Sequence, residues 1–239
     1  TPAAGRRTVF GRGIRKKGRR NLTKAVFLDY TGTITREDSP DVTRMLDRLC
    51  RNSDCKDGKK LAQACWRFVR AREAGSCGAD FMTEDEIVDR MLRRLEKKFR
   101  LRDDRTELHA LFQNHWKYAP IFDDVKGFFE KCPVPVYLVT NNGAQYVRAA
   151  MQRNGLHPAA IVCGDMVKAY KPRREIFQKA LEVSGVSASS AVHVGDSVSS
   201  DVKGALSAGI RPVLLNRTGA DVPVGVESVS RLPDVLPLL

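Results

Sequence analysis

The stretch Val26-Phe27-Leu28-Asp29-Tyr30-Thr31-Gly32-Thr33 decides how the rest of the chain can be interpreted. Its apolar start predicts a short buried strand, which delivers the carboxylate of Asp29 into a turn built from Thr and Gly. In an open α/β sheet, ligands bind at the carboxyl ends of the strands, which is where Asp29 would lie. An aspartate in this place more often forms a turn or caps a helix, so its chemical role depends on the rest of the sequence.

Two later stretches carry groups suited to a phosphate. The apolar run 134–140 ends in Thr140, whose hydroxyl can donate to a phosphate oxygen, and Asn141 follows it. Further on, Lys171 precedes Pro172. We expect this Pro to begin a helix whose positive amino end favours anions.

A further apolar run, Ala191–Gly195, again ends in a carboxylate. Asp196 follows the run directly, and Asp201 lies five residues later. Each of these four stretches is a weak signal alone. Their common place, at a strand end or a helix start, makes the set a strong one.

In this order the four stretches resemble the four motifs of the haloacid dehalogenase superfamily, over residues 24–35 and 119–239. The resemblance implies that Asp29 is the nucleophile, that Thr140 and Asn141 hold the transferring phosphoryl group, and that Lys171 neutralises it. The chemistry supports these roles, because a carboxylate attacks phosphorus only where the charge of the phosphate is neutralised and the groups are held in line.

The same resemblance implies Mg²⁺ as the cofactor. Asp29, the backbone carbonyl of Thr31 and Asp196 would bind the ion directly, whereas Asp201 would act through a water molecule or a neighbouring ligand. Oxygen ligands of this kind are those that Mg²⁺ prefers.

The chain departs from the phosphatases of the superfamily at Thr31. Those enzymes usually carry a second Asp two residues after the nucleophile, which protonates the leaving oxygen and then activates water. A threonine does neither near neutral pH. At this second position, dehalogenases of the superfamily have Tyr and phosphonoacetaldehyde hydrolases have Ala. The string Asp-x-Thr-Gly-Thr also resembles the phosphorylation site of P-type ATPases, but the chain has no run of about 18 apolar residues to span a membrane.

From Thr31 we expect slow hydrolysis of alkyl phosphates, because the departing alkoxide needs a proton. Acyl phosphates, phosphoanhydrides and aryl phosphates should be preferred, and the phosphorylated enzyme could accumulate. A residue of the helical segment 36–118 could supply the missing acid, and His115 is the candidate because it lies near the end of that segment.

Residues 36–118 show only helical patterns. Ser39-Pro40 predicts a helix start, and Thr83-Glu84-Asp85-Glu86 predicts a capping box. The position and character of the segment resemble the C1 cap of the superfamily, which closes over the active site and selects the substrate. Three of its arginines, Arg67, Arg70 and Arg72, could hold an anionic substrate, although such a charged helix face is usually just solvated.

From residue 122 onward, helical and strand patterns alternate, which predicts an α/β fold with a doubly wound, Rossmann-like parallel sheet and an inserted helical cap. The expected strands are 134–140, 159–163, 190–195 and 211–215, and the expected helices are 122–131, 143–154, 173–184 and 200–208. A short strand and a turn are expected within 222–239. His193 falls inside a strand and is interpreted as a core residue, and His109 as a packing or surface residue.

The net charge of +13 arises mainly in an N-terminal arm, residues 1–23. Nine Lys or Arg and no acidic residue lie within residues 1–24. Binding of nucleic acid through residues 6–24 is one interpretation, because clustered basic side chains release counterions from phosphates. A solvated arm without function is the favoured interpretation, and a transit peptide is a third.

Composition narrows the class of protein further. A hydrophobic content of 42% with 29% charged residues is that of a soluble globular protein. The first 25 residues hold no continuous apolar segment typical of a secretory signal, so we expect a cytoplasmic protein with no membrane contact. The six cysteines include no close Cys-x-x-Cys pair and are expected to be reduced and mostly buried.

The sequence therefore predicts a Mg²⁺-dependent hydrolase or phosphotransferase, acting on a small phosphorylated metabolite through an aspartyl-phosphate at Asp29. Two alternatives remain. One is a phosphonoacetaldehyde hydrolase-like enzyme that cleaves a C–P bond through an imine at a cap lysine, with Lys56, Lys59 and Lys60 as candidates. The other is a catalytically weak protein that binds nucleic acid through its basic arm.

Overall fold

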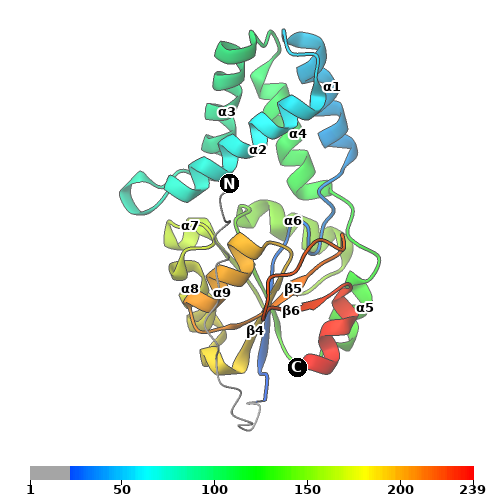
Figure 1. Cartoon of the computed structure of the whole chain (residues 1–239), viewed down its shortest axis with the longest axis vertical. Coiled ribbons are helices and arrows are strands. Elements are labelled where there is room, and N and C mark those ends of the chain that lie inside the picture. Colours follow the sequence, from blue (N-terminus) through cyan, green and yellow to red (C-terminus); the bar gives the residue numbers. More distant parts are fainter. Residues whose placement is uncertain (1–21) are drawn as a thin grey trace, which may run out of the picture.

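The computed structural model describes residues 22–239. Its centre is a six-stranded parallel sheet in the order β3-β2-β1-β4-β5-β6 (Figure 1). The strands are β1 (Ala25–Leu28), β2 (Val136–Thr140), β3 (Ala160–Cys163), β4 (Ala191–Gly195), β5 (Arg211–Leu215) and β6 (Glu227–Val229). Strands are added first on one side of β1 and then on the other, so the sheet is doubly wound, as the sequence predicted.

Helices cover both faces of the sheet. They are α5 (Val125–Lys131), α6 (Ala144–Asn154), α7 (Gly164–Val167), α8 (Arg174–Ser184) and α9 (Lys203–Ser207), with the shorter or irregular helical segments η2 (Ala188–Ser190), η3 (Val198–Val202) and η4 (Leu232–Leu238). Val26 and Leu28 of β1 pack with α5, α6 and η4, whereas Phe27 packs with α8 and α9. Because both faces are buried, β1 is apolar at every position, which is typical of a central parallel strand.

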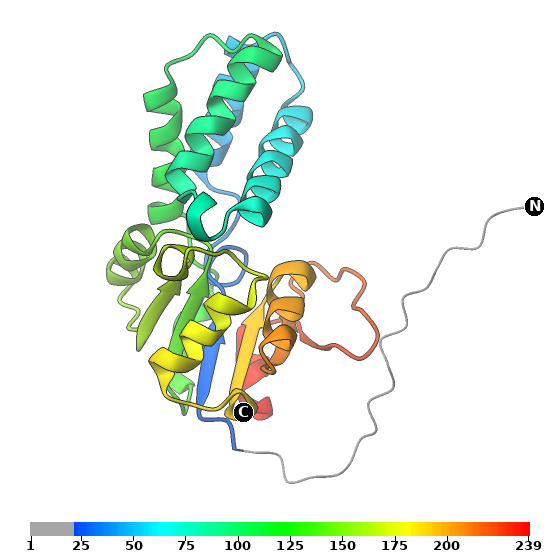
Figure 2. The same ribbon diagram turned by 90° about the vertical axis from the view of Figure 1, so that its left-hand side faces the viewer.

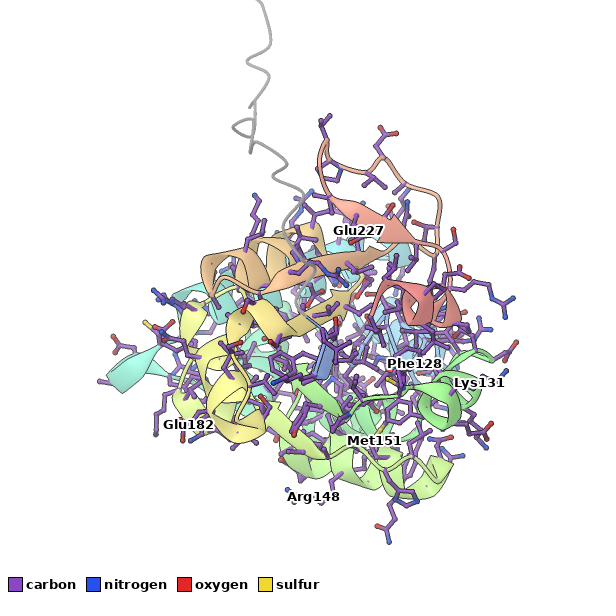
Figure 3. All side chains as sticks on the ribbon, turned by 90° about the horizontal axis from the view of Figure 1, so that it is seen from below. Phe128, Lys131, Arg148, Met151, Glu182 and Glu227 are labelled. Carbon is purple, nitrogen blue, oxygen red and sulfur yellow. The ribbon has the colours of Figure 1, made fainter. Side chains whose placement is uncertain are left out.

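Figure 3 shows the molecule from below, from the side on which the amino ends of the strands lie. Phe128 of α5 and Met151 of α6 point into the packed interior and are almost fully buried. Lys131 and Glu182 project outward from the helices that cover the two faces. The candidate motif residues lie at the opposite edge.

Five α-helices lie between β1 and β2 in the chain, and the first four of them form a separate layer beyond the carboxyl ends of the strands (Figures 1 and 2). They are α1 (Pro40–Asn52), α2 (Gly58–Gly75), α3 (Glu84–Phe99) and α4 (Arg105–Tyr118), with the turn η1 (Gly78–Asp80) between α2 and α3. They share a hydrophobic core of their own, built around Leu49, Leu61 and Leu92. The bounds 36–118 and the function of this layer as a cap remain predictions.

Two of the predicted helix starts in this layer are confirmed. Ser39 caps α1, with Pro40 as its first residue. Thr83 and Glu86 form the expected capping box of α3, in which each side chain bonds the backbone of the other residue.

The predicted start of the helix after Lys171 is wrong. Helix α8 begins at Arg174, not at Pro172. Lys171 and Pro172 lie in a turn before the helix. The Arg173 backbone N–H closes this turn by donating to the Tyr170 carbonyl at 2.9 Å. This turn keeps Lys171 at the sheet edge.

The segment predicted as one helix over 200–208 also differs. It begins with a wider π-helical turn, η3, and continues as the short helix α9. The Ser197 carbonyl accepts from the amides of both Asp201 and Val202, at 2.8 and 3.2 Å, and the second bond defines the wider turn. Such turns are frequent at functional sites, and here the turn carries the buried Asp201.

All six cysteines are free, as expected, but only Cys65 and Cys163 are buried. The other four are partly exposed, so the expectation of mostly buried thiols is wrong. No helix within residues 22–239 has the length and apolar character needed to cross a membrane.

Most of the basic arm, and with it most of the predicted nucleic-acid segment 6–24, lies outside the described residues. The described part starts just before the sheet, where Thr23 is buried and the Lys24 amide donates to the Ser190 carbonyl at 2.8 Å.

Candidate active site

The four sequence motifs converge at the carboxyl edge of the sheet, next to β1. Asp29 follows β1, Asp196 follows β4, and Asp201 comes from η3. The order in which successive strands are added to the sheet reverses at this point, which is where doubly wound sheets bind their ligands. One oxygen from each of the three carboxylates lies within 4.8 Å of the others.

Lys171 joins two of these carboxylates. Its Nζ donates to Asp29 Oδ1 at 2.5 Å and to Asp201 Oδ1 at 2.7 Å. Burial lowers the pKa of Lys171, but the carboxylates of Asp201 and Asp29 outweigh burial and raise it above its usual value. The ammonium group therefore stays charged beside Asp29.

Asp201 is held by more than Lys171. His193 Nε2 donates to Asp201 Oδ1 at 2.9 Å, and the Ser197 amide donates to Asp201 Oδ2 at 3.0 Å. Burial favours a raised pKa for Asp201, but Lys171 and His193 hold it well below its usual value. His193 is fully buried, as predicted for a core residue, but it also orients a side chain of the site.

Two glycines leave the space that the carboxylates occupy. A Cβ on Gly195 would lie 2.2 Å from Asp201 Cγ, and one on Gly32 would lie 2.5 Å from Asp196 Oδ2. Gly32 also has φ +83°, in the left-handed region that favours glycine. Both positions therefore need glycine for the acidic cluster to form.

Asp29, Asp196 and Asp201 together place three carboxylates around one lysine, so the cluster has an excess of acidic groups. Burial raises the pKa of Asp29 to about 7, opposed by Lys171 and reinforced by Asp201 and Asp196. Burial and the charge of Asp201 raise the pKa of Asp196 to about 6. Three clustered carboxylates with one lysine fit a hard divalent cation that takes oxygen ligands, such as Mg²⁺.

Asn142 links the second motif to the nucleophile loop. Its Oδ1 accepts from the hydroxyls of Thr31, at 2.8 Å, and Thr140, at 3.2 Å. The backbone N–H of Asn142 donates to Thr140 Oγ1 at 3.0 Å. Thr31 and Thr140 are therefore brought together, with their hydroxyl protons directed to Asn142.

Asn141 connects the sheet edge to the helical layer. Its Oδ1 accepts from the Lys171 amide at 2.7 Å, and its Nδ2 donates to Glu73 Oε1 of α2 at 3.2 Å. Asn142 makes a similar connection, because its Nδ2 donates to Glu84 Oε1 of α3 at 2.7 Å. The Gly143 amide donates to Glu84 Oε2 at 2.9 Å.

A cavity of about 360 Å³ opens between the sheet edge and the helical layer. Asp29, Thr31, Asn141, Lys171, Asp196 and Asp201, which the sequence predicted, all line it. Thr140 is fully buried beneath it and reaches the others through Asn142. The upper walls are largely apolar, with Val42, Leu46, Trp66, Val69, Phe112 and Trp116 among them.

Of the predicted basic side chains of the helical layer, Arg70 alone lines this cavity. Arg70 lies 4.2 Å from the Trp66 ring centre and donates to the hydroxyls of Ser199 and Ser200 of η3. Arg67 and Arg72 are exposed elsewhere on α2.

The candidate imine lysines are not part of the cavity lining. Lys56 donates to the carbonyls of Cys50 and Arg51 at the end of α1, and Lys59 and Lys60 are exposed. The lysine of the cavity lining is Lys171. Within residues 22–239, no lysine of the helical layer lines this cavity.

The two histidines of the helical layer differ. His115 lines the cavity, but its Nδ1 lies 2.9 Å from Ser39 Oγ, and burial lowers its pKa. His109 lies outside the cavity, between Asp85 and Asp89. His109 is partly exposed, which agrees with the expected packing or surface position.

Sequence reasoning missed Glu73, Glu84 and Asn142. Burial raises the pKa of Glu73 to about 7 and that of Glu84 well above its usual value. Glu84 was visible only as part of a capping box, and Glu73 as one acidic residue on a charged helix. Asn142, beside the predicted Asn141, had the clearest signal of the three.

Comparisons with known proteins agree with this architecture. Residues 23–209 match the family model of the haloacid dehalogenase-like hydrolases. An N-acylneuraminate-9-phosphatase from Rattus norvegicus is 27% identical over 229 residues, which cover 90% of this chain and 73% of that protein. The haloacid dehalogenase-like hydrolase domain-containing protein 3 of Danio rerio is 42% identical over 84 residues, 32% of this chain and 35% of that protein. The chain thus spans only about a third of the zebrafish relative.

Solved structures share the fold. The HAD-hydrolase YfnB from Bacillus subtilis superposes with a TM-score of 0.73 at 19% identity, covering 91% of this chain and 99% of the other. A HAD phosphatase from Thermococcus onnurineus gives 0.63 at 24% identity, covering 90% and 97%.

Proposed function

The chain belongs to the haloacid dehalogenase-like hydrolase family, and we propose that it is a Mg²⁺-dependent phosphatase of small phosphorylated substrates that works through an aspartyl-phosphate at Asp29. The observation that carries this proposal is the contact of 2.5 Å between Asp29 and Lys171 at the floor of a cavity, beside two further carboxylates. The phosphatase activity of the rat relative, which aligns with 90% of this chain, supports the same reaction class.

In the first step, an oxygen of Asp29 attacks phosphorus and the bond from phosphorus to the leaving oxygen breaks, with its electron pair going to that oxygen. In the second step, water attacks phosphorus and loses a proton, and the bond to Asp29 breaks with its electron pair going to Asp29. Inorganic phosphate is released and the free carboxylate is regenerated. Lys171 offsets the negative charge of the phosphoryl group in both steps, while Asn141 holds the Lys171 backbone in place.

Asp29, Asp196 and Asp201 are the residues that would hold Mg²⁺, with the Thr31 carbonyl as the further ligand implied by the sequence motif. When bound, the ion supplies charge neutralisation for the phosphoryl group. His193 and the Ser197 amide fix the orientation of Asp201, which should make the site better ordered.

The cavity walls indicate which substrates would fit. The polar groups gather at the sheet edge, and the walls from α1, α2 and α4 are largely apolar. A phosphate monoester with a partly apolar body would bury that body against the helical layer, which would then act as the cap that selects the substrate. Arg70 in the cavity lining would favour a second negative group.

The test is a panel of phosphate esters, assayed with Mg²⁺ and with EDTA, on the unmodified chain and on Asp29→Asn. We expect Mg²⁺-dependent release of phosphate that Asp29→Asn abolishes, because an amide does not attack phosphorus. Asp221→Asn, at an exposed position, is the matched control and should keep full activity. Turnover that survives in Asp29→Asn would rule out the aspartyl-phosphate.

A further inference from the structure

Glu73 is a carboxyl group of the helical layer that is linked to the reaction centre through Asn141 and Lys171. It lies near the end of α2 and lines the same cavity as Asp29. Its Oε1 accepts from Asn141 Nδ2, Asn141 Oδ1 accepts from the Lys171 amide, and Lys171 Nζ contacts Asp29. Its second oxygen, Oε2, has no hydrogen-bond partner within residues 22–239.

The nucleophile loop itself holds no acid at the position where phosphatases of this family usually carry one. Thr31 occupies that position, and its hydroxyl proton is directed to Asn142 Oδ1 at 2.8 Å. A proton for the leaving group must therefore come from another side chain of the cavity.

The other titratable groups of the helical layer are less suitable. Both oxygens of Glu84 accept N–H groups, from Asn142 and Gly143, which gives this carboxyl a positioning function. His115 is engaged with Ser39, and burial favours its neutral form. Glu37, which also lines the cavity, is exposed to solvent.

Charged groups from several elements face Glu73. Arg70 lies on its own helix, Lys171 and Asp29 lie at the sheet edge, and Glu84 lies on α3. Burial raises the pKa of Glu73 to about 7, while the Asn141 hydrogen bond, Arg70 and Lys171 oppose the rise. Both the acid and the carboxylate are thus populated near neutral pH, as a group that gives and takes a proton requires.

We propose that Glu73 of α2 is the general acid and base of this active site, in place of the residue that Thr31 replaces. This inference rests on the proposed phosphatase function. When Asp29 attacks phosphorus and the bond to the leaving oxygen breaks, the Glu73 carboxyl gives its proton to that oxygen and becomes a carboxylate. When water attacks the aspartyl-phosphate, the carboxylate takes a proton from the water, and Glu73 returns to its starting form.

The proposal changes what the sequence alone predicts for substrate preference. With Glu73 in place, the unmodified chain should hydrolyse alkyl phosphates as well as aryl phosphates. The preference for leaving groups that depart without a proton, expected from Thr31, should emerge only when Glu73 is replaced.

Glu73→Gln is the decisive variant, because its amide oxygen keeps the acceptor for Asn141 Nδ2 while the transferable proton is lost. The readout is kcat/KM for a primary alkyl phosphate and for p-nitrophenyl phosphate with Mg²⁺, since kcat/KM covers only the steps up to phosphorylation of Asp29. We expect a loss of about 10²–10⁴-fold for the alkyl ester and a much smaller loss for the aryl ester. Glu130→Gln, an exposed control on α5, should change neither.

Two further measurements separate proton transfer from positioning. In the unmodified chain, kcat/KM for the alkyl ester should fall as the pH rises above about 7, relative to the aryl ester, and Glu73→Gln should remove this difference. Thr31→Asp combined with Glu73→Gln should recover part of the alkyl activity. The pH comparison needs no variant, so it tests the proposal even if Glu73→Gln fails to fold.

The proposal is overturned if the pH profiles of kcat/KM for the alkyl and aryl esters coincide in the unmodified chain. It is also overturned if Glu73→Gln lowers kcat/KM equally for both esters or for neither. The phosphatase assignment stands in those cases as long as aryl phosphate turnover requires Asp29. If the unmodified chain shows no Asp29-dependent turnover of any ester, the proposed function itself fails.

Discussion

At the scale of single residues, Lys171 balances a buried acidic cluster. It is 5% exposed and contacts both Asp29 and Asp201. In the described part of the chain, no other Lys or Arg forms an ion pair with these carboxylates. The charge balance of the site without a bound ion therefore depends on this side chain.

Lys171→Met should destabilise the protein in EDTA by about 3–5 kcal/mol, because it leaves buried carboxylates without a cation. The loss of stability should be smaller towards pH 5, where protonation of the carboxylates removes the unpaired charge. Addition of Mg²⁺ should restore part of the lost stability. Urea unfolding measures the effect, with Lys203→Met at an exposed position as the control. Equal stability of the two variants would contradict the assignment.

Glu73 should make folding stability depend on pH. Its pKa rises from 4.5 to about 7 on folding, mainly through burial, so the folded state binds the proton more tightly than the unfolded state. The stabilisation is full below about pH 4.5 and is lost as the pH rises through 7. The free energy of unfolding of the unmodified chain should therefore fall over this range relative to Glu73→Gln, and parallel curves for the two proteins would show that Glu73 has an ordinary pKa.

At the scale of elements, the carboxyl end of β4 and the π-helical turn η3 act as one unit. The strand ends in Gly195, and the turn folds Asp201 back against that glycine. The Ser197 amide closes the unit by donating to Asp201. The acidic cluster therefore depends on the backbone at this junction as well as on its carboxylates.

Gly195→Ala should displace Asp201, because the added Cβ would lie 2.2 Å from Asp201 Cγ. We expect a loss of about 1–3 kcal/mol in the free energy of unfolding. The Mg²⁺ concentration that gives half-maximal activity should also rise.

The control is Gly127→Ala inside α5, where an added Cβ meets no heavy atom within 4 Å. This substitution should be neutral or stabilise by about 0.5–1 kcal/mol. If Gly195→Ala behaves like Gly127→Ala, the close approach at the strand end is not required.

At the scale of the whole molecule, the active-site cavity lies between two separate hydrophobic cores. The sheet contributes the polar floor, and the four-helix layer contributes the apolar walls, Arg70 and Glu73. Hydrogen bonds from Asn141 to Glu73 and from Asn142 to Glu84 connect the two parts across the site. Relative movement of the layers would therefore change the reaction centre directly.

Deleting residues 1–21 should leave kcat and KM within a few-fold, because every residue of the candidate site lies in the described part of the chain. If the basic arm contacts polyanions, the deletion should weaken binding to nucleic acid and reduce its dependence on salt. Titrations of both proteins with RNA and DNA at several salt concentrations measure this. If the chain with the arm shows no salt-sensitive binding, an electrostatic function of the arm is ruled out.

The sequence by itself determined the sheet, its parallel topology and the order of the motifs. Apolar runs of strand length alternate with helical patterns, and each run ends in a polar group, as around Asp29, Thr140 and Asp196. The physical reason is local: strand and helix periodicity and the position of a carboxylate after a strand are all properties of neighbouring residues.

Only the tertiary structure decided which side chains complete the site. Glu73 lies 68 positions from Asn141 in the chain, and Arg70 is 130 positions from Ser200, so no local pattern distinguishes them from a solvated helix face. The π-helical turn and the exclusion of Lys56, Lys59 and Lys60 from the cavity are likewise outcomes of packing. Burial and proximity between distant segments raise the pKa of Glu73, and these are properties of the folded chain that sequence spacing does not contain.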